Sequence, residues 1–221
     1  MFCHSTIQIN QPVCSKKVLR PTALVFAILA ASLSALLLSS CGTGNPRNGV
    51  IISVKDQKML LVRKGEPVKA YSISTSKFGL GSKRGSKCTP IGRMEVAKKF
   101  GRGAPSGAVF KSRRRTGEVI RPDAPGRDPI VSRILWLRGK QSRNSNTYGR
   151  YIYIHGTPEE RNIGHKASYG CIRMKSRDVI DLYRQLAVGS QVHIIRGSLK
   201  RTQAGQAYAA QNESYLPAAG N

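Results

Sequence analysis

The sequence predicts a mainly β domain with one short helix near its C-terminal end. Short runs of alternating apolar and polar residues recur between positions 50 and 155, and turn-forming residues separate them. Only one later stretch, from Ser176 to Leu186, repeats apolar residues at helical spacing. We therefore expect one domain over residues 49–196.

The β part of this domain begins with a meander of short strands and closes with a strand after the helix. Strands are expected at residues 50–54, 59–62, 68–73, 93–98, 130–137, 151–155 and 191–195. Residues 76–88 form a glycine- and lysine-rich loop, and residues 101–129 form a long irregular excursion with one hairpin around Val109 and Val119. Alternation places Tyr153 and His155 on one face of their strand, together with Tyr151.

The predicted helix follows a cysteine-containing segment. Ser176 is a candidate N-cap, and the apolar stripe consists of Val179, Ile180, Leu182, Tyr183 and Leu186. Residues 197–221 lack apolar periodicity and are rich in small and polar residues, so we expect a disordered tail.

The N-terminus has the pattern of a secretory signal. Three basic residues precede an uncharged apolar run over 21–40, which ends in Leu-Ser-Ser before Cys41. This ending resembles a bacterial lipobox, so residues 1–40 are expected to be a lipoprotein signal peptide, Cys41 to carry lipid, and residues 41–48 to be a tether. The alternative is a transmembrane anchor, because twenty apolar residues can cross a bilayer. The lipoprotein interpretation places the domain on the periplasmic side of a membrane, and Gly42 favours the outer one.

The chain is strongly basic, with 37 Lys and Arg residues against 11 Asp and Glu and a net charge of +26. Such a charge indicates a polyanionic neighbourhood, whether nucleic acid, an anionic membrane surface or an acidic wall polymer. No zinc-finger spacing or aromatic RNA-binding motif accompanies the charge, so a specific nucleic-acid partner is not predicted.

Two cysteines remain once the signal and the lipidated residue are set aside, Cys88 and Cys171. They could form a structural disulfide in an exported protein. The other interpretation is a nucleophile at Cys171, because His155 lies sixteen positions earlier at a strand end and Arg173 follows closely. A cysteine nucleophile needs a base, donors for the developing oxyanion and a group that holds the substrate. No cluster with the spacing of metal ligands is present, and neither a metal nor a cofactor is predicted.

Three motifs occur in order along the domain. They are Thr89-Pro90-x-Gly92, then Ile154-His155-Gly156-Thr157, then Ser168-x-Gly170-Cys171-Ile172-Arg173-Met174. This set resembles the catalytic domain of the L,D-transpeptidases (YkuD type) over most of residues 49–196. The resemblance implies a β-sandwich with one short helix after the catalytic cysteine.

The resemblance also implies roles for individual residues. Cys171 would be the nucleophile and His155 the base, with the backbone carbonyl of Gly156 orienting the imidazole. The backbone at Gly170 and Cys171 would form the oxyanion region, and Arg173 would bind a carboxylate of the substrate.

Two further residues of the last motif, Ser168 and Tyr169, are candidates for substrate contact. Ser168 would hydrogen-bond either within its loop or to substrate, and these alternatives stay open. Tyr169 stands where the family often has histidine, and it is a further candidate for substrate contact.

The reaction implied is acyl transfer on the stem peptides of peptidoglycan. Cys171 would attack a tetrapeptide stem, release D-alanine and form a thioester, which an amine of a neighbouring stem would resolve into a 3→3 cross-link. Water as acceptor would make the enzyme an L,D-carboxypeptidase, and a protein amine would anchor that protein to the wall. A non-catalytic peptidoglycan-binding lipoprotein and a basic polyanion-binding protein remain as alternatives.

Overall fold

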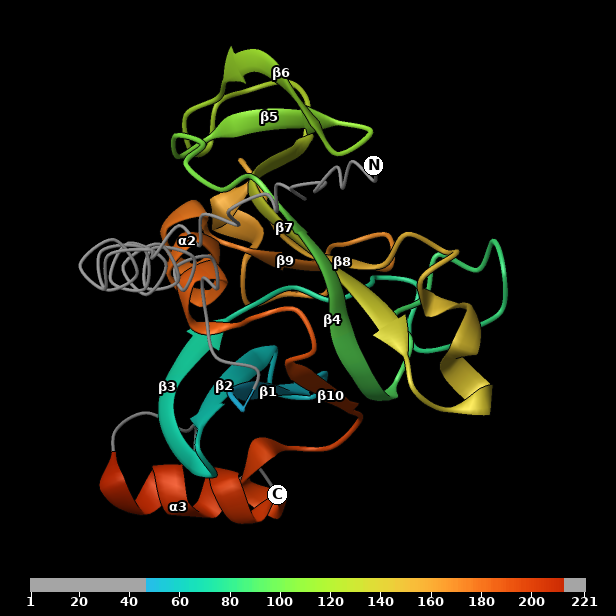
Figure 1. Ribbon diagram of the computed structural model, residues 1–221, viewed down its shortest axis with the longest axis vertical. Coiled ribbons are helices and arrows are strands. Elements are labelled where there is room, and N and C mark those ends of the chain that lie inside the picture. The colour runs from blue at the N-terminus through green and yellow to red at the C-terminus, as the bar shows by residue number, and fades with distance from the viewer. Residues whose placement is uncertain (1–46, 213–221) are drawn as a thin grey trace, which may run out of the picture. The chain divides into compact units, whose positions relative to one another are not determined.

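The computed structural model describes residues 47–212, and in this range the chain is mainly β (Figure 1). The predicted signal peptide, Cys41, most of the tether and residues 213–221 lie outside the described residues. The strands are β1 (Gly49–Ser53), β2 (Lys58–Arg63), β3 (Glu66–Ser72), β4 (Gly92–Phe100), β5 (Ala108–Lys111), β6 (Arg114–Val119), β7 (Ile130–Gly139), β8 (Tyr153–Gly156), β9 (Ile172–Met174) and β10 (Gln191–Ile195). The helices are α2 (Ser176–Gln185), α3 (Gln203–Gln211) and the short 3-10 helices η1 (Ser142–Thr147), η2 (Glu160–Asn162) and η3 (Leu199–Arg201).

The strands are hydrogen-bonded into one continuous, branched sheet. Its main path runs β3-β2-β1-β10-β4-β7-β5-β6, and β8 branches from β7 to pair with β9. The β1–β10 and β8–β9 pairs are parallel, and the other pairs are antiparallel. The expected mainly β fold is confirmed, and the branch at β7 is what brings β9 into the sheet.

One hydrophobic core joins the two arms of the branched sheet. It contains Ile52 and Met59 from the β1–β2 arm together with Ile154 and Ile172 from the β8–β9 arm, and all four are almost fully buried. These arms therefore face each other across shared apolar packing, which fixes the position of β8 and β9. Removing such side chains from water is the main stabilising contribution to the fold.

Helix α2 packs on this core with the apolar stripe that the sequence predicts. Val179, Leu182 and Tyr183 are buried, and Leu186 just after the helix is also buried. Ser176 is the first helical residue rather than the N-cap, which is Lys175. The Ser176 backbone N–H donates to the Glu160 carboxylate at 2.8 Å, so an anion satisfies the first turn of the helix.

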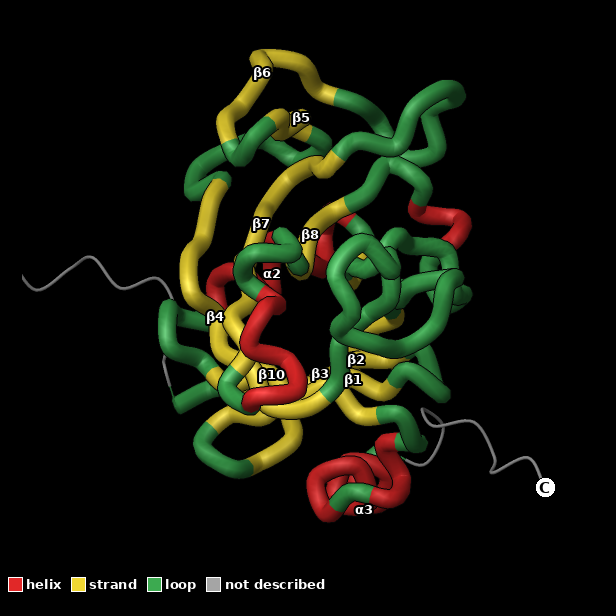
Figure 2. The backbone as a smooth tube through the Cα atoms, turned by 90° about the vertical axis from the view of Figure 1, so that its right-hand side faces the viewer, coloured by secondary structure: helices red, strands yellow, loops and turns green. Residues whose placement is uncertain are grey.

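The segment after residue 197 differs from the expected disordered tail, because α3 packs against the outer face of the β2–β3 region (Figure 2). Tyr208 of α3 and Leu199 of η3 are buried against Leu60 and Ala70. The Thr202 hydroxyl caps the helix by accepting from the Gly205 N–H at 3.0 Å. Two buried apolar residues and one cap thus anchor α3. So few apolar residues do not repeat at helical spacing, and the sequence therefore shows no helix signal.

The long excursion over 101–129 carries the predicted hairpin as β5 and β6. Its turn residues Ser112 and Arg113 both have positive φ, 50° and 66°, as in a type I′ turn.

Tyr151 also has a positive φ of 57° and lies outside β8. The expected alternation of Tyr151 with Tyr153 and His155 was therefore wrong at its first residue.

Candidate active site

The candidate nucleophile and base lie on adjacent parallel strands. In the β8–β9 register Ile154 is opposite Ile172 and His155 is opposite Arg173, so Cys171 falls opposite Tyr153. Directly paired residues point to the same side of a sheet, and the side-chain direction alternates along each strand. His155 and Cys171 therefore occupy neighbouring positions on one face, as the motifs predict.

His155 is buried, with 5% of its surface exposed, and its ring is held from one side. Its Nδ1 atom lies 2.8 Å from the Gly156 carbonyl oxygen, which is the orienting contact that the family resemblance implies. Burial lowers the pKa of His155 to about 4, and the nearby Arg173 cation acts in the same direction. The imidazole is therefore neutral at pH 7 and able to accept a proton.

The thiol of Cys171 contacts two backbone groups. The Tyr153 N–H donates to Sγ at 3.4 Å, and the thiol donates to the Tyr151 carbonyl at 3.5 Å. Burial raises the pKa of Cys171 to about 11, while the Tyr153 N–H, Arg173 and Arg150 act in the opposite direction. The resting site thus contains a neutral thiol and a neutral imidazole rather than an ion pair.

Ser168 and Gly170 shape the loop that presents Cys171. The Ser168 hydroxyl is fully buried, donates to the Cys171 carbonyl at 2.6 Å and accepts from the Gly170 N–H at 3.2 Å. These contacts and the burial of Ser168 favour its loop role, while its substrate role stays a prediction. Gly170 has a φ of 122°, which side-chain-bearing residues rarely adopt.

The Gly170 bond to Ser168 also limits the oxyanion region. With the Gly170 N–H already engaged, the Cys171 N–H is the donor of this pair that remains to meet a developing oxyanion. The oxyanion assignment itself stays a prediction.

Tyr169 points outward, with 54% of its surface exposed. Its ring packs on Phe78 with centroids 5.5 Å apart, and its hydroxyl accepts from the Lys77 ammonium at 3.2 Å. This exposure is compatible with the predicted substrate contact, which stays a prediction. It also places a neutral donor, not an imidazole, at this position beside the cysteine.

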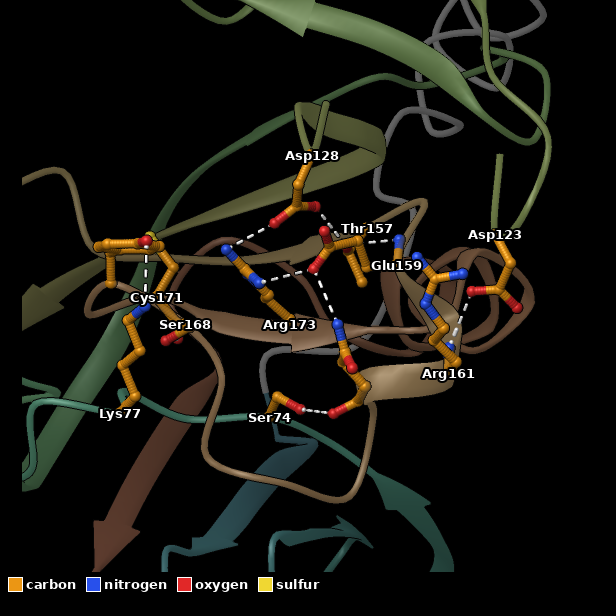
Figure 3. A network of polar contacts seen from close by, with 12 residues as sticks. Ser74, Lys77, Asp123, Asp128, Thr157, Glu159, Arg161, Ser168, Cys171 and Arg173 are labelled. Atoms are coloured by element: carbon orange, nitrogen blue, oxygen red, sulfur yellow. Dashed lines mark hydrogen bonds and ion pairs between the residues drawn. The ribbon is translucent and has the colours of Figure 1, made fainter. Parts of the chain in front are cut away.

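Arg173 lies in an ionic network rather than facing open solvent (Figure 3). Its guanidinium is 2.6 Å from the Asp128 carboxylate and 3.8 Å from that of Glu159, and only 9% of the residue is exposed. Asp128 also accepts from the Thr157 hydroxyl. The predicted substrate-carboxylate role of Arg173 is untested, and these contacts weigh against it, because two protein carboxylates already neutralise the cation.

The chain is similar to known proteins. A family model for the L,D-transpeptidase catalytic domain (YkuD) matches residues 47–194. The chain belongs to this family.

Individual relatives of this L,D-transpeptidase domain are distant. The chain is 25% identical over 171 residues to the probable L,D-transpeptidase YcfS of Escherichia coli K12, covering 77% of this chain and 51% of that protein. It is 27% identical over 153 residues to the putative L,D-transpeptidase YqjB of Bacillus subtilis, covering 68% of this chain and 74% of that protein. The chain thus spans about half the length of the first of these relatives.

Solved structures of L,D-transpeptidases are also similar to the chain. One from Mycobacterium smegmatis aligns with a TM-score of 0.43 and 14% identity, covering 67% of this chain and 58% of that one. One from Xylanimonas cellulosilytica aligns with a TM-score of 0.43 and 17% identity, covering 75% and 68%.

Cys88 and Cys171 are both free thiols in the L,D-transpeptidase domain, so the disulfide alternative is not what the structure contains. The Cys88 thiol donates instead to the Phe78 carbonyl at 3.1 Å. The Arg150 guanidinium donates to the Cys88 carbonyl at 2.7 Å and to the Gly81 carbonyl at 3.0 Å, which fastens the 81–88 loop beside Gly170.

Several residues around Cys171 carried no sequence signal. Asp128 lies in an irregular segment 45 positions before its partner Arg173, and Arg150 and Arg113 are two arginines among many. An aromatic cluster was also missed, in which Trp136 stacks on Tyr148 at 4.0 Å and meets Tyr153 edge-on at 5.6 Å. Cys171 packs against this cluster.

Other features of residues 47–212 lie away from the thiol. One hollow of about 420 Å³ lies between β3 and α2, and another of about 520 Å³ lies along β4 and β10. Across the described residues no group of three or more histidine, cysteine, aspartate or glutamate side chains could hold a metal ion. No helix in this range is both long and apolar enough to cross a membrane.

Proposed function

We propose that this protein is a peptidoglycan L,D-transpeptidase that works through a cysteine acyl-enzyme. The observation that supports this most directly is the placement of His155 and Cys171 on one face of the β8–β9 pair, with the His155 Nδ1 held by the Gly156 carbonyl. This geometry occurs inside a domain of the L,D-transpeptidase family.

The first half-reaction forms a thioester on Cys171. Sγ attacks the carbonyl carbon of the third residue of a tetrapeptide stem, and Nε2 of His155 takes the thiol proton as the S–C bond forms. Because both groups are neutral at pH 7, proton transfer accompanies the attack instead of preceding it. Collapse of the tetrahedral intermediate breaks the C–N bond, and His155 returns the proton to the departing D-alanine.

The second half-reaction transfers the acyl group to an acceptor. His155 takes a proton from an amine of a neighbouring stem, the amine nitrogen bonds to the thioester carbon, and the C–S bond breaks. The thiol regains its proton, and the product is a 3→3 cross-link. Water in place of the amine would give a tripeptide, and a protein amine would give a wall-anchored protein.

We further propose that lipid on Cys41 holds this domain on the periplasmic side of a membrane, with the outer membrane favoured. The support is the lipobox-like ending of the apolar run and the strong positive charge of the remaining chain. An anionic wall or membrane surface suits a protein of this charge.

The test uses the full chain with a disaccharide-tetrapeptide, and mass spectrometry follows the products. Loss of D-alanine is expected in the wild type and in Cys88→Ala but not in Cys171→Ala. A dimer as product would identify cross-linking, and a tripeptide would identify hydrolysis. Absence of any D-alanine loss from a protein with intact circular dichroism, with and without an added protein acceptor, would favour a non-catalytic binding role instead.

A further inference from the structure

Arg113 lies in the turn between β5 and β6, the hairpin labelled in Figure 1. Its guanidinium packs on the aromatic cluster that Cys171 also contacts. The Cζ atom of Arg113 lies 4.9 Å from the ring centre of Trp136 and 5.5 Å from that of Tyr151. Its Nη1 donates to the Tyr153 hydroxyl at 3.3 Å. Such contacts hold a planar cation over ring faces while leaving its other N–H groups for a ligand.

The residues that contact Arg113 also contact the thiol. The Tyr153 backbone N–H donates to Cys171 Sγ, and the thiol donates to the Tyr151 carbonyl. Tyr151 is 54% exposed, so solvent reaches the aromatic residues on which Arg113 packs. Tyr153 and Tyr151 therefore contact Arg113 through their side chains and Cys171 through their backbones.

Arg173, Arg150 and Arg113, the last on the aromatic cluster that Cys171 contacts, differ in what they already bind. Arg173 is neutralised by Asp128 and a second carboxylate, and Arg150 donates to backbone carbonyls of the 81–88 loop. Among the described residues, by contrast, no carboxylate forms an ion pair with Arg113. Arg113 is thus a cation without an acidic partner, and it packs on the aromatic cluster that Cys171 contacts, so it is suited to bind an anionic substrate.

The backbone holds Arg113 in place at some cost in conformational energy. Positive φ at both Ser112 and Arg113 is unfavourable for residues with side chains, and glycine or asparagine usually fills such a turn. A strained position at a ligand-facing turn is consistent with a functional requirement for this side chain.

We propose that Arg113 binds a carboxylate of the acyl-donor stem peptide, the role that the family resemblance implies for Arg173. This inference rests on the proposed function. The carboxylate belongs either to the C-terminal D-alanine or to the side chain of the diamino acid, and both flank the bond that Cys171 attacks. Tyr151 and Trp136 hold the guanidinium plane, so that two parallel N–H groups meet the two oxygens.

The first experiment does not require transpeptidase activity. Iodoacetate and iodoacetamide both alkylate a thiolate by displacing iodide, and they differ in a carboxylate against an amide. Alkylation of Cys171 in the full chain is followed by peptide mass spectrometry. Arg113→Gln is expected to lower the iodoacetate-to-iodoacetamide rate ratio at Cys171 by about fivefold, while the iodoacetamide rate itself stays unchanged.

Matched controls separate a local effect from the general positive field. Arg114→Gln removes one charge from the same hairpin at an exposed position, and it is expected to leave the ratio at Cys171 unchanged. The ratio at Cys88 provides an internal reference in every variant. Equal effects of Arg113→Gln and Arg114→Gln, or an effect of Lys77→Gln in place of Arg113→Gln, would overturn the proposal.

The second experiment identifies the carboxylate with peptide substrates. For a tetrapeptide acid against its C-terminal amide, the wild type is expected to prefer the acid in kcat/KM, and Arg113→Gln is expected to lose that preference. Loss of preference only between a diaminopimelate stem and a lysine stem would assign the side-chain carboxylate instead. Retention of both preferences in Arg113→Gln would overturn the inference, while absence of turnover in the wild type would count against the proposed function alone.

Discussion

The imidazole of His155 and the backbone carbonyl of Gly156 are joined by a contact of 2.8 Å between Nδ1 and the oxygen. A carbonyl oxygen can only accept, so Nδ1 carries the hydrogen and Nε2 of the neutral ring is left with its lone pair. The next residue of the same strand thereby sets the tautomer of the base. A backbone group suffices for the position that a carboxylate fills in many catalytic triads.

The pH dependence of thiol reactivity tests the neutral resting state. Because burial holds the pKa of Cys171 at about 11 and the thiolate is the reactive form, alkylation by iodoacetamide is expected to rise about tenfold per pH unit between pH 7 and 10. The measurement is the alkylation rate of Cys171 by peptide mass spectrometry. A rate that stays level from pH 6 to 9 would mean a preformed thiolate–imidazolium pair.

The pH dependence of stability follows from His155. Its pKa is about 4 in the folded protein against an ordinary 6.5, so the unfolded chain binds more protons between these values. The contribution of His155 to stability is complete above pH 6.5 and is lost as the pH falls toward 4, by about 3 kcal/mol. Urea unfolding at pH 7 and pH 4.5 should show a smaller decrease for His155→Gln than for the wild type, and equal decreases would contradict the expectation.

The pH dependence of stability at alkaline pH follows from Cys171. Its pKa is raised from 9.0 to about 11, so the folded protein holds a proton that the unfolded chain releases. This contribution to stability is complete below pH 9 and is lost as the pH rises toward 11. Cys171→Ala should unfold with a weaker loss of stability above pH 9 than the wild type, and Cys88→Ala should behave as the wild type.

The elements predicted from sequence are those specified by local pattern. Alternation located β8, and the helical stripe located α2, because burial of one face imposes the pattern directly on neighbouring residues. Helix α3 was missed because its anchoring depends on Tyr208 and a contact from η3, too few residues to produce a period.

The residues of the candidate site also fall into those that local sequence motifs indicate and those that only tertiary folding brings together. The placement of His155 and Cys171 on adjacent strands could be predicted, because motif spacing reflects the β8–β9 pairing. The partner of Arg173 was not found, since Asp128 arrives from a distant irregular segment by tertiary folding alone. The sequence indicates a basic residue near the cysteine, but it does not indicate that the carboxylate of Asp128 neutralises Arg173.

Ser168→Ala tests the loop role that the structure gives to this residue. The variant removes the donor to the Cys171 carbonyl and the acceptor of the Gly170 N–H, so the free energy of unfolding should fall by about 1–2 kcal/mol. Ser145→Ala, which loses an exposed bond within η1, is the control and should change little. A raised KM with unchanged stability would instead restore the substrate role of Ser168.

Asp128→Asn tests the ionic network around Arg173. The variant leaves a guanidinium that is 9% exposed with its nearest carboxylate at 3.8 Å, on Glu159, and stability should fall by about 3 kcal/mol in urea unfolding. The matched control is Glu118→Gln, whose carboxylate pairs with Arg127 at an exposed position and whose loss should cost under about 1 kcal/mol. Equal effects of the two variants would show that burial of the Arg173 pair is not what matters.

Gly170→Ala tests whether the backbone before the cysteine must be glycine. The backbone φ of Gly170 is 122°, which an alanine would have to adopt. Its Cβ would lie 3.3 Å from Ile152 Cδ1 and 3.4 Å from the carbonyl oxygens of Lys87 and Cys88. Backbone strain of this kind costs about 1–3 kcal/mol, and relief of the crowding would displace Cys171 from the Tyr153 N–H.

Gly164→Ala provides the matched control, because Gly164 lies in the same β8–β9 connection with a φ of 103° and open space around its Cβ position. Both variants should lose stability in urea unfolding, since both carry the strain. Only Gly170→Ala should also change the alkylation rate of Cys171, because only there does the added methyl group crowd the walls of the site. An unchanged alkylation rate in Gly170→Ala would mean that glycine serves the turn alone and does not set the position of the thiol.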